Sequence, residues 1–368
     1  MKQFLLNTLK NLGPKLNHHA VVFESDDWGS FRIPDNAAYE ALEKKGVQLK
    51  FPGSDQYNLY DNLESTNDLE RLFEVLLSYK DCLNNPVTFT PLSLVANPDF
   101  RKIKDSEFQH YYYMNLPQSY EYYGKGDVLS TFKKGISEGI FCPQFHGREH
   151  LNVAVWMRAL QNDIGDARVA FNHEVWGQIN THPNNIFYQA AFDLEYADDL
   201  VSQKEIIQNG LKLFESTFGY RAEYFVPPNG PMNNQLLPVL SEGGVKLISS
   251  DTLQIQTLGN GRTSKHFRYM GMRNKFGQRY IKRNCFFEPS GKDKDWVDAC
   301  LRDIELAFKN GKPAVISTHR VNYVGDRSAE NRDMGLKQLD TLLKRMLLKW
   351  PKIEFINTPK LFNYFSKN

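Results

Sequence analysis

The 368-residue sequence is poor in cysteine, in net charge and in long apolar runs. Its four cysteines are scattered and form no CxxC pair, which argues against a zinc–thiolate site or a disulfide framework. A net charge of +2, without a basic run, gives no electrostatic case for nucleic-acid binding. No stretch is apolar for long enough to predict a transmembrane segment. With 41% hydrophobic and 24% charged residues, the composition is that of an ordinary globular protein.

The beginning of the chain carries no recognisable secretion signal. Residues 1–16 mix Phe and Leu with Lys, and the apolar run is too short and too interrupted for a signal peptide. We expect a short amphipathic helix there and a cytoplasmic location, with contact to a membrane surface as the alternative. The sequence does not indicate an oligomeric state.

Apolar strand-like segments alternate with helical patterns along most of the chain. This alternation predicts a parallel β/α architecture of seven or eight strands, which is enough for a barrel. We expect a single domain over 1–368, interrupted by insertions at about 91–138 and 163–200. The predicted strands cover residues 20–23, 87–90, 140–145, 222–226, 245–249, 280–287, 314–319 and 353–356.

Two histidines four residues apart, His146 and His150, stand between an apolar segment and a run with helical periodicity. If a helix begins at or near His146, this spacing places both imidazoles on one face. Two neutral imidazoles on one face can bind a metal ion. A pair of ordinary structural histidines is the alternative.

Other polar side chains follow predicted strands. Asp26 and Asp27 come after 20–23, and His319 ends 314–319. Adjacent carboxylates repel, so they are tolerated in water or beside a cation, and a solvated turn is the alternative. In a β/α barrel the carboxyl ends of all strands meet at one mouth. One Asp and two His in that mouth would suit a hydrolytic divalent metal ion.

The order of these motifs resembles that of the polysaccharide deacetylases with a NodB-homology domain, carbohydrate esterase family 4. The family's Thr-Phe-Asp-Asp-Gly corresponds to ESDDWG at 24–29, and its His-Ser/Thr-x-x-His to HGREH at 146–150. Its Arg-x-Pro-Tyr-Gly corresponds to FVPPNG at 225–230. Two shorter motifs correspond to DW at 295–296 and ISTH at 316–319.

The resemblance implies a distorted (β/α) barrel that removes N-acetyl groups from a sugar or polysaccharide with a divalent metal ion, Zn²⁺ by expectation. It assigns the metal to Asp27, His146 and His150, the role of general base to Asp26, and that of general acid to His319. Four further residues are expected near the substrate or its oxyanion: Trp28, Arg148, Pro228 and Asn229, the last through its backbone N–H.

One departure from the family pattern bears on activity. The Arg that orients the base in the third motif is replaced by Val226, for which Arg148 and Arg320 are the candidate substitutes. The departure leaves open a catalytically inactive carbohydrate-binding barrel. A glycosidase that pairs Asp26 with Glu149 or Glu288 is a further alternative, and it would act without a metal.

Overall fold

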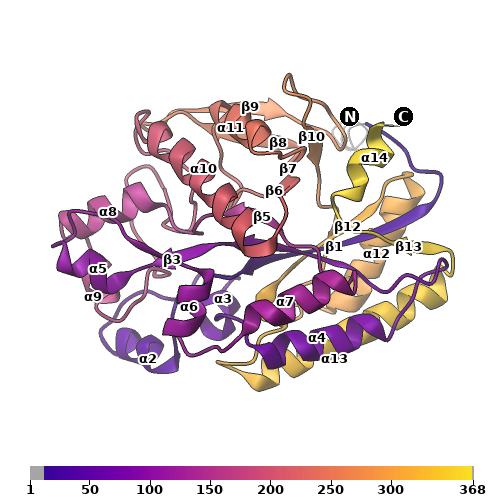
Figure 1. The fold of residues 1–368 in the computed structure, drawn as a ribbon, viewed down its shortest axis with the longest axis horizontal. Helices are drawn as coiled ribbons and strands as arrows, with labels where there is room; N and C mark the ends of the chain where they lie inside the picture. The colour runs from indigo at the N-terminus through magenta and orange to yellow at the C-terminus, as the bar shows by residue number, and fades with distance from the viewer. Residues whose placement is uncertain (1–11, 367–368) are drawn as a thin grey trace.

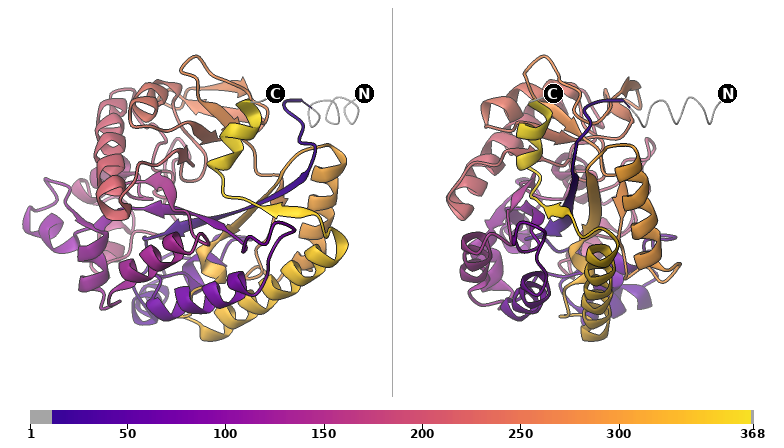
Figure 2. Two further views of the ribbon diagram at one scale, coloured as in Figure 1. Left: turned by 45° about the vertical axis from the view of Figure 1, so that its right-hand side comes forward. Right: turned by 90° about the vertical axis from the view of Figure 1, so that its right-hand side faces the viewer.

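The structure, a computed structural model, describes residues 12–366. The amphipathic helix expected over 1–16 therefore falls mainly outside the described residues. Within them the chain folds around one large curled sheet with helices packed outside it (Figures 1 and 2). No helix of this part combines the length and apolarity needed to cross a bilayer.

All strands of the large sheet are parallel, as the alternation predicted. β13 (Ile353–Phe355) pairs beside the start of β1. The other strands follow the order β10 (Arg279–Ile281), β7 (Leu247–Ser249), β6 (Tyr224–Phe225), β5 (Gln144–Gly147), β2 (Phe89–Leu94), β1 (His19–Trp28), β12 (Ala314–His319) and β11 (Cys285–Phe286).

The two edges of this sheet are joined by a very short link. β10 and β11 lie at opposite ends of the strand order, yet only residues 282–284 separate them in sequence. The sheet must therefore curl until its edges approach each other. No pairing between these edges occurs among the described strands, so the parallel α/β class is confirmed but a closed barrel is not shown.

The prediction of one strand over 280–287 was wrong, for a reason visible in the link. Arg283 turns its side chain toward carboxylates on β1. Asn284 uses its backbone N–H and its side-chain oxygen to bond Val315 on β12, which begins the pairing with the other edge. The polar residues 282–284 thus separate two different strands, β10 and β11.

Alternation along β1 divides the core into two clusters. Val21 and Phe23 face the helices, whereas Ala20 and Val22 face the inside of the curled sheet. Such alternation is the period-2 pattern of a strand buried on both faces. The inner cluster is completed by apolar side chains of α14 (Lys360–Ser366).

The outer helices agree closely with the sequence pattern. α4 (Thr66–Leu77) begins with a Ser65–Asp68 capping box, and α13 (Ala329–Lys349) begins with Ser328 as its N-cap. α10 (Asp199–Phe218) includes Ser202, whose hydroxyl donates to the Asp199 carbonyl in the first turn. The others are α2 (Asn36–Lys44), α7 (Val128–Ser137), α8 (Val153–Gln161), α11 (Leu237–Glu242) and α12 (Trp296–Lys309).

Several short helices and hairpins interrupt the alternation of strands and helices, and they were not predicted individually. The first expected insertion contains the hairpin β3–β4 (Ala96–Pro98, Tyr113–Asn115) and the helices α5 (Phe100–Asp105) and α6 (Leu116–Tyr122). The second contains α9 (Ala167–Phe171). α3 (Gln56–Tyr60) and the hairpin β8–β9 (Leu253–Thr257, Thr263–Phe267) complete the rim.

A fully buried arginine ties the segment after β12 to the segment before α4. Arg320 donates to Asp61 at 2.9 and 3.1 Å, to Glu64 at 2.7 Å and to the carbonyl of Ser30 at 2.5 Å. Removing one partner of a buried ion pair leaves the other charge uncompensated. This cluster therefore fixes the segment after β12 against the segment before α4.

We expect Arg320→Met to lower the free energy of unfolding by about 3–5 kcal/mol, because Glu64 would remain buried without its cation and Asp61 would keep only the more distant Arg32, at 3.6 Å. Urea denaturation measures the change. Arg221→Met is the control, since its ion pair with Glu215 is exposed and should contribute only about 0–1 kcal/mol. Equal effects of the two substitutions would contradict the role of the buried cluster.

Candidate functional site

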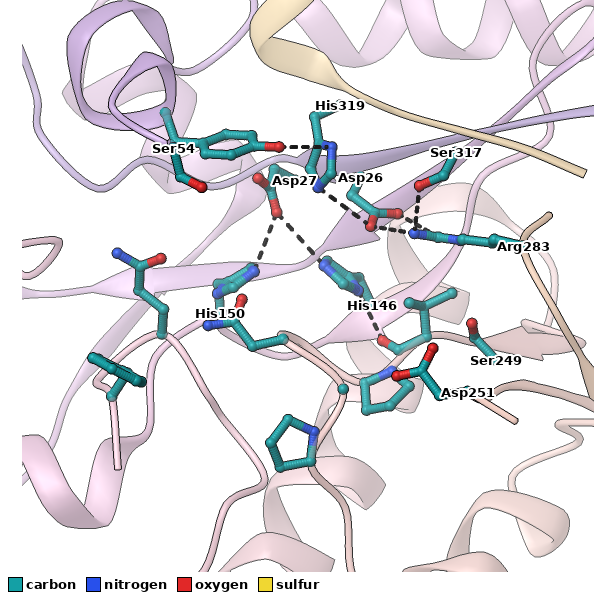
Figure 3. A pocket seen from close by; sticks show the side chains of 18 of the residues that line it. Asp26, Asp27, Ser54, His146, His150, Ser249, Asp251, Arg283, Ser317 and His319 are labelled. Atoms are coloured by element: carbon teal, nitrogen blue, oxygen red, sulfur yellow. Dashed lines mark hydrogen bonds and ion pairs between the residues drawn. The ribbon is translucent and has the colours of Figure 1, made fainter. Parts of the chain in front are cut away.

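A cavity of about 710 Å³ opens where β1, β5 and β12 end (Figure 3). The five residues expected to hold the metal and catalyse the reaction all line it: Asp26, Asp27, His146, His150 and His319. They come from three neighbourhoods of the chain, brought together because parallel strands end at one edge of the sheet.

An irregular end of β1 lets two consecutive carboxylates share the cavity. In a regular strand, neighbouring side chains point to opposite faces. Here the register with β2 shifts between Ser25 and Trp28, and Asp27 has φ 76°, a conformation that costs a non-glycine residue of the order of 1–3 kcal/mol. Asp26 and Asp27 consequently both line the cavity.

The same irregularity takes Trp28 away from the position expected for it. Its ring is fully buried, packs edge-on against Phe132 and Phe141, and donates its N–H to Ser25 Oγ at 2.9 Å. Trp28 therefore belongs to the core and does not line the cavity, in contrast to the expected substrate contact.

The two histidines do not share a helix face, so that prediction was wrong. His146 lies in β5, and α8 begins only at Val153. Gly147, with φ 142°, turns the chain after the strand and lets His150 return from the following loop. The Nε2 atoms of His146 and His150 lie 3.6 and 3.2 Å from Asp27 Oδ1.

Hydrogen bonds leave the facing atoms available to a ligand. His146 Nδ1 lies 2.7 Å from the Val226 carbonyl, so this nitrogen is the donor and Nε2 keeps its lone pair. Asp27 Oδ2 accepts from Arg32 at 3.0 Å, whereas the buried Oδ1 has no hydrogen-bond partner among the described residues. A buried carboxylate oxygen without a partner is costly, and a cation between it and the imidazoles would satisfy it.

The charge states suit a metal ion. Burial lowers the pKa of His150 in spite of the nearby Asp27 carboxylate, which favours the neutral, ligating imidazole. Burial alone would raise the pKa of Asp27, but the Arg32 guanidinium holds it well below its usual range.

The spacing also suits a metal ion. Two atoms bound about 2.0–2.2 Å from one tetrahedral ion are roughly 3.3–3.6 Å apart, close to the separations of the Nε2 atoms from Asp27 Oδ1. Within residues 12–366, this is the one group of three His, Cys, Asp or Glu residues whose ligand atoms lie within 4.8 Å of one another.

Asp26 is held by an arginine that sequence reasoning missed. Arg283, on the link between the sheet edges, donates to both carboxylate oxygens of Asp26 at 2.6 Å (Figure 3). Its Nε donates to Glu24 at 2.7 Å. Burial alone would raise the pKa of Asp26, but Arg283, His146 and His319 lower it, so the group is ionised at neutral pH.

The two arginines proposed as substitutes lie elsewhere. Arg148 bonds Glu149 at 2.6 Å, and Arg320 bonds the buried acids before α4. Neither residue lines the cavity. Arg283 was overlooked because the predicted strand over 280–287 was taken to continue through Lys282, Arg283 and Asn284.

His319 lies between two carboxylates. Its Nδ1 is 2.5 Å from Glu288 Oε1 and 3.2 Å from the Tyr57 hydroxyl, and its Nε2 is 3.7 Å from Asp26 Oδ2. Asn322 donates to the other Glu288 oxygen at 2.8 Å. Burial would lower the pKa of His319, but Glu288 and Asp26 raise it to about 9, so the imidazole is a cation at neutral pH.

The remaining predicted residues divide between the cavity and its surroundings. Asn229, which has a left-handed conformation with φ 55°, lines the cavity. Pro227 lines it as well, but Pro228 does not. Three aromatic side chains that sequence reasoning did not single out complete the wall: Phe51, Phe187 and Phe286. The last two are 42% and 49% exposed, which places them at the rim.

Comparisons with known proteins give a likeness of fold. No protein-family model matches the chain, and no curated protein matches its sequence. Among solved structures, a probable polysaccharide deacetylase from Pseudomonas aeruginosa is similar, with 10% identity and a TM-score of 0.47 over 95% of this chain and 91% of that one.

Two further structures show the same range of similarity. Puue allantoinase is 11% identical, with a TM-score of 0.47 over 95% of this chain and 90% of that chain. A family 4 carbohydrate esterase pseudoenzyme from Bacillus anthracis is also 11% identical, with a TM-score of 0.37 over 94% and 66%. Because these TM-scores lie below 0.5, function has to be inferred from the residues of the cavity.

We expect the chain to bind one Zn²⁺ at this site. Asp27→Asn and His150→Ala should each weaken binding about 100-fold or more, beyond the 10–100-fold typical of residues that only support a ligand. Competition with a chromogenic chelator measures the affinity. His182→Ala is the control, because His182 also pairs with a carboxylate, Glu195 at 3.0 Å, outside the cavity. Equal affinity in all variants would contradict the assignment.

We also expect Glu288→Gln to lower the pKa of His319 from about 9 toward its ordinary value of 6.5, since the largest charge that raises it is removed. The imidazole C–H resonances in an NMR titration report this pKa. Because the pKa is raised by folding, the interaction stabilises the fold fully below pH 6.5, and this stabilisation is lost as the pH rises through 9. An unchanged pKa in the variant would contradict the assigned cause.

Proposed function

We propose that the chain is a metal-dependent hydrolase that removes N-acetyl groups from a sugar or glycan. The observation that carries this proposal is the arrangement of one cavity. Asp27, His146 and His150 offer three ligand atoms to a metal ion, and Asp26 and His319 stand beside them as an ionised carboxylate and a charged imidazole.

The metal would be held by Asp27 Oδ1 and the Nε2 atoms of the two histidines, which have the donor types and spacing that zinc prefers. When bound, a divalent ion supplies Lewis acidity, which lowers the pKa of a water molecule and polarises an acyl carbonyl. The Val226 carbonyl fixes the ring of His146 through Nδ1, so the backbone of the altered third motif supports the site.

The protein's own groups account for the two proton transfers of amide hydrolysis. Asp26, oriented by Arg283, accepts a proton from the water that adds to the acetyl carbon. His319 donates its Nε2 proton to the amide nitrogen as the carbon–nitrogen bond breaks, and acetate and the free amine are released. Glu288 holds the opposite ring nitrogen, so the acidic proton faces the side of Asp26. The backbone N–H of Asn229 is our candidate for stabilising the oxyanion.

The shape of the cavity is consistent with a carbohydrate. A volume of about 710 Å³ lies within the range of about 300–1,000 Å³ common for small-molecule sites. Phe187 and Phe286 present exposed aromatic surface at the rim, to which the apolar face of a sugar ring could pack. The motif order that resembles the deacetylases supports the same class of substrate.

The two alternatives receive less support from the contacts. The glycosidase was expected to pair Asp26 with Glu149 or Glu288. Glu149 is paired with Arg148, Glu288 lies on the far side of the His319 ring from Asp26, and neither lines the cavity. The inactive barrel was favoured by the absent motif-three arginine, and Arg283 supplies a guanidinium to the same carboxylate.

We expect the chain to release acetate and free amine from N-acetylated sugars, and this activity to disappear with a chelator and return with Zn²⁺. Asp26→Asn should lower kcat about 10²–10⁴-fold while the bound metal is retained, because a base is lost without losing a ligand. Arg283→Met should lower kcat more than it raises KM, since Arg283 acts through Asp26. Lys344→Gln, at an exposed position of α13, is the control and should be neutral.

Activity that survives both chelation and His146→Ala would contradict the metal mechanism. Sugar binding without any acetate release, in protein that contains its metal, would instead favour the inactive barrel. Cleavage of a glycosidic bond without metal would favour the glycosidase.

A further inference from the structure

A second hollow lies on the outer side of the sheet, between α10, the segment before α11 and residues 268–280. These elements lie together in the upper part of Figure 1. The hollow has a volume of about 570 Å³. Its charged lining residues are all cations, namely Lys204, Arg268, Arg273 and Lys275.

The four cations lack compensating charges in the structure. No carboxylate lines the hollow, and within residues 12–366 no ion pair to an acid is found for any of the four. Elsewhere in this chain, partly buried arginines such as Arg158 are paired with acids at 2.6–2.8 Å. Four like charges around one hollow repel each other, and a bound anion would relieve that repulsion.

Buried donors in the same hollow also lack acceptors. Tyr280 is 1% exposed, and its hydroxyl has no hydrogen-bond partner among the described residues. The Nε of Arg268 is buried and unpartnered as well, and the guanidinium carbon lies 4.6 Å from the centre of the Tyr280 ring. Buried donors normally have partners, so this pair indicates a missing acceptor.

We propose that this hollow binds an organic phosphate. Two guanidinium groups and two ammonium groups match a phosphate, which carries up to two negative charges and accepts bidentate hydrogen bonds from arginine. The volume exceeds what a bare phosphate fills and lies in the range of small-molecule sites. Leu237, Met272 and the partly exposed Phe276 line the same hollow and provide contacts for the organic part.

This site is separate from the proposed active site. Tyr280 packs in the core on the outer face of β10, whereas the next residue, Ile281, belongs to the cluster inside the curled sheet. None of the residues around the hollow lines the cavity that holds Asp27. The two proposals can therefore fail independently.

Isothermal titration of the full chain with phenyl phosphate, inorganic phosphate and phenol at constant ionic strength tests the proposal. We expect phenyl phosphate to bind more tightly than inorganic phosphate, and phenol to bind negligibly. Arg273→Gln should weaken phenyl phosphate about tenfold or more, because a charge-assisted contact is lost. Tyr280→Phe, which removes only a hydroxyl, should weaken it roughly fivefold.

Two variants control for charge and for the other cavity. Lys344→Gln removes one positive charge from an exposed position of α13, and Asp27→Asn alters the proposed metal site; neither should change the affinity. Equal affinity for phenyl phosphate and inorganic phosphate would overturn the organic part of the proposal. Unchanged binding in Arg273→Gln and Tyr280→Phe, or loss of binding in Asp27→Asn, would overturn the site itself.

Discussion

The pairing of Arg283 with the carboxylates of β1 connects the shape of the sheet to the chemistry of the cavity. Arg283 stands on a link of three residues that must reach from one edge of the sheet to the other. Its guanidinium lies between Glu24 and Asp26 and bonds both at 2.6–2.7 Å. The interaction therefore ties the link between the two sheet edges to β1 and fixes the carboxylate proposed as the base.

The site divides its supporting contacts between distant parts of the chain. Arg32 binds one oxygen of Asp27 and leaves the other for a ligand, while the Val226 carbonyl fixes the His146 ring. Glu288 fixes the ring of His319 in a similar way, by binding its Nδ1 on the side away from Asp26. Because Val226 contributes through its backbone, the change from arginine at this position removes a side chain from the site without removing this support. Arg283 supplies the missing charge from another strand end.

Much of the fold could be read from the sequence because hydrophobic periodicity and helix caps are local. α13 and the capped start of α4 follow directly from such patterns. The meeting of Asp27 with His146 and His150 could also be anticipated, since strand ends converge in any parallel β/α sheet. The hairpin β8–β9 could not, because it pairs outside the main sheet and β8 exposes Leu253 and Ile255 while it buries Gln254 and Gln256, the reverse of what apolar alternation predicts.

What sequence reasoning missed depends on long-range contacts. A spacing of four between histidines suits a helix, but here a strand, a glycine turn and a loop produce the same proximity. The role of Arg283 arises from the break between β10 and β11, which only the closing of the sheet explains. Trp28 stands in the first motif, yet the bulge in β1 turns it into the core.

The central claim is that Asp27, His146 and His150 together hold a metal ion. A crystal structure of the chain grown with Zn²⁺, with anomalous data at the zinc edge, tests it most directly. The account predicts one strong anomalous peak about 2.0–2.2 Å from Asp27 Oδ1 and from both histidine Nε2 atoms. A cavity without a peak, or a peak bound only by residues elsewhere, would contradict it.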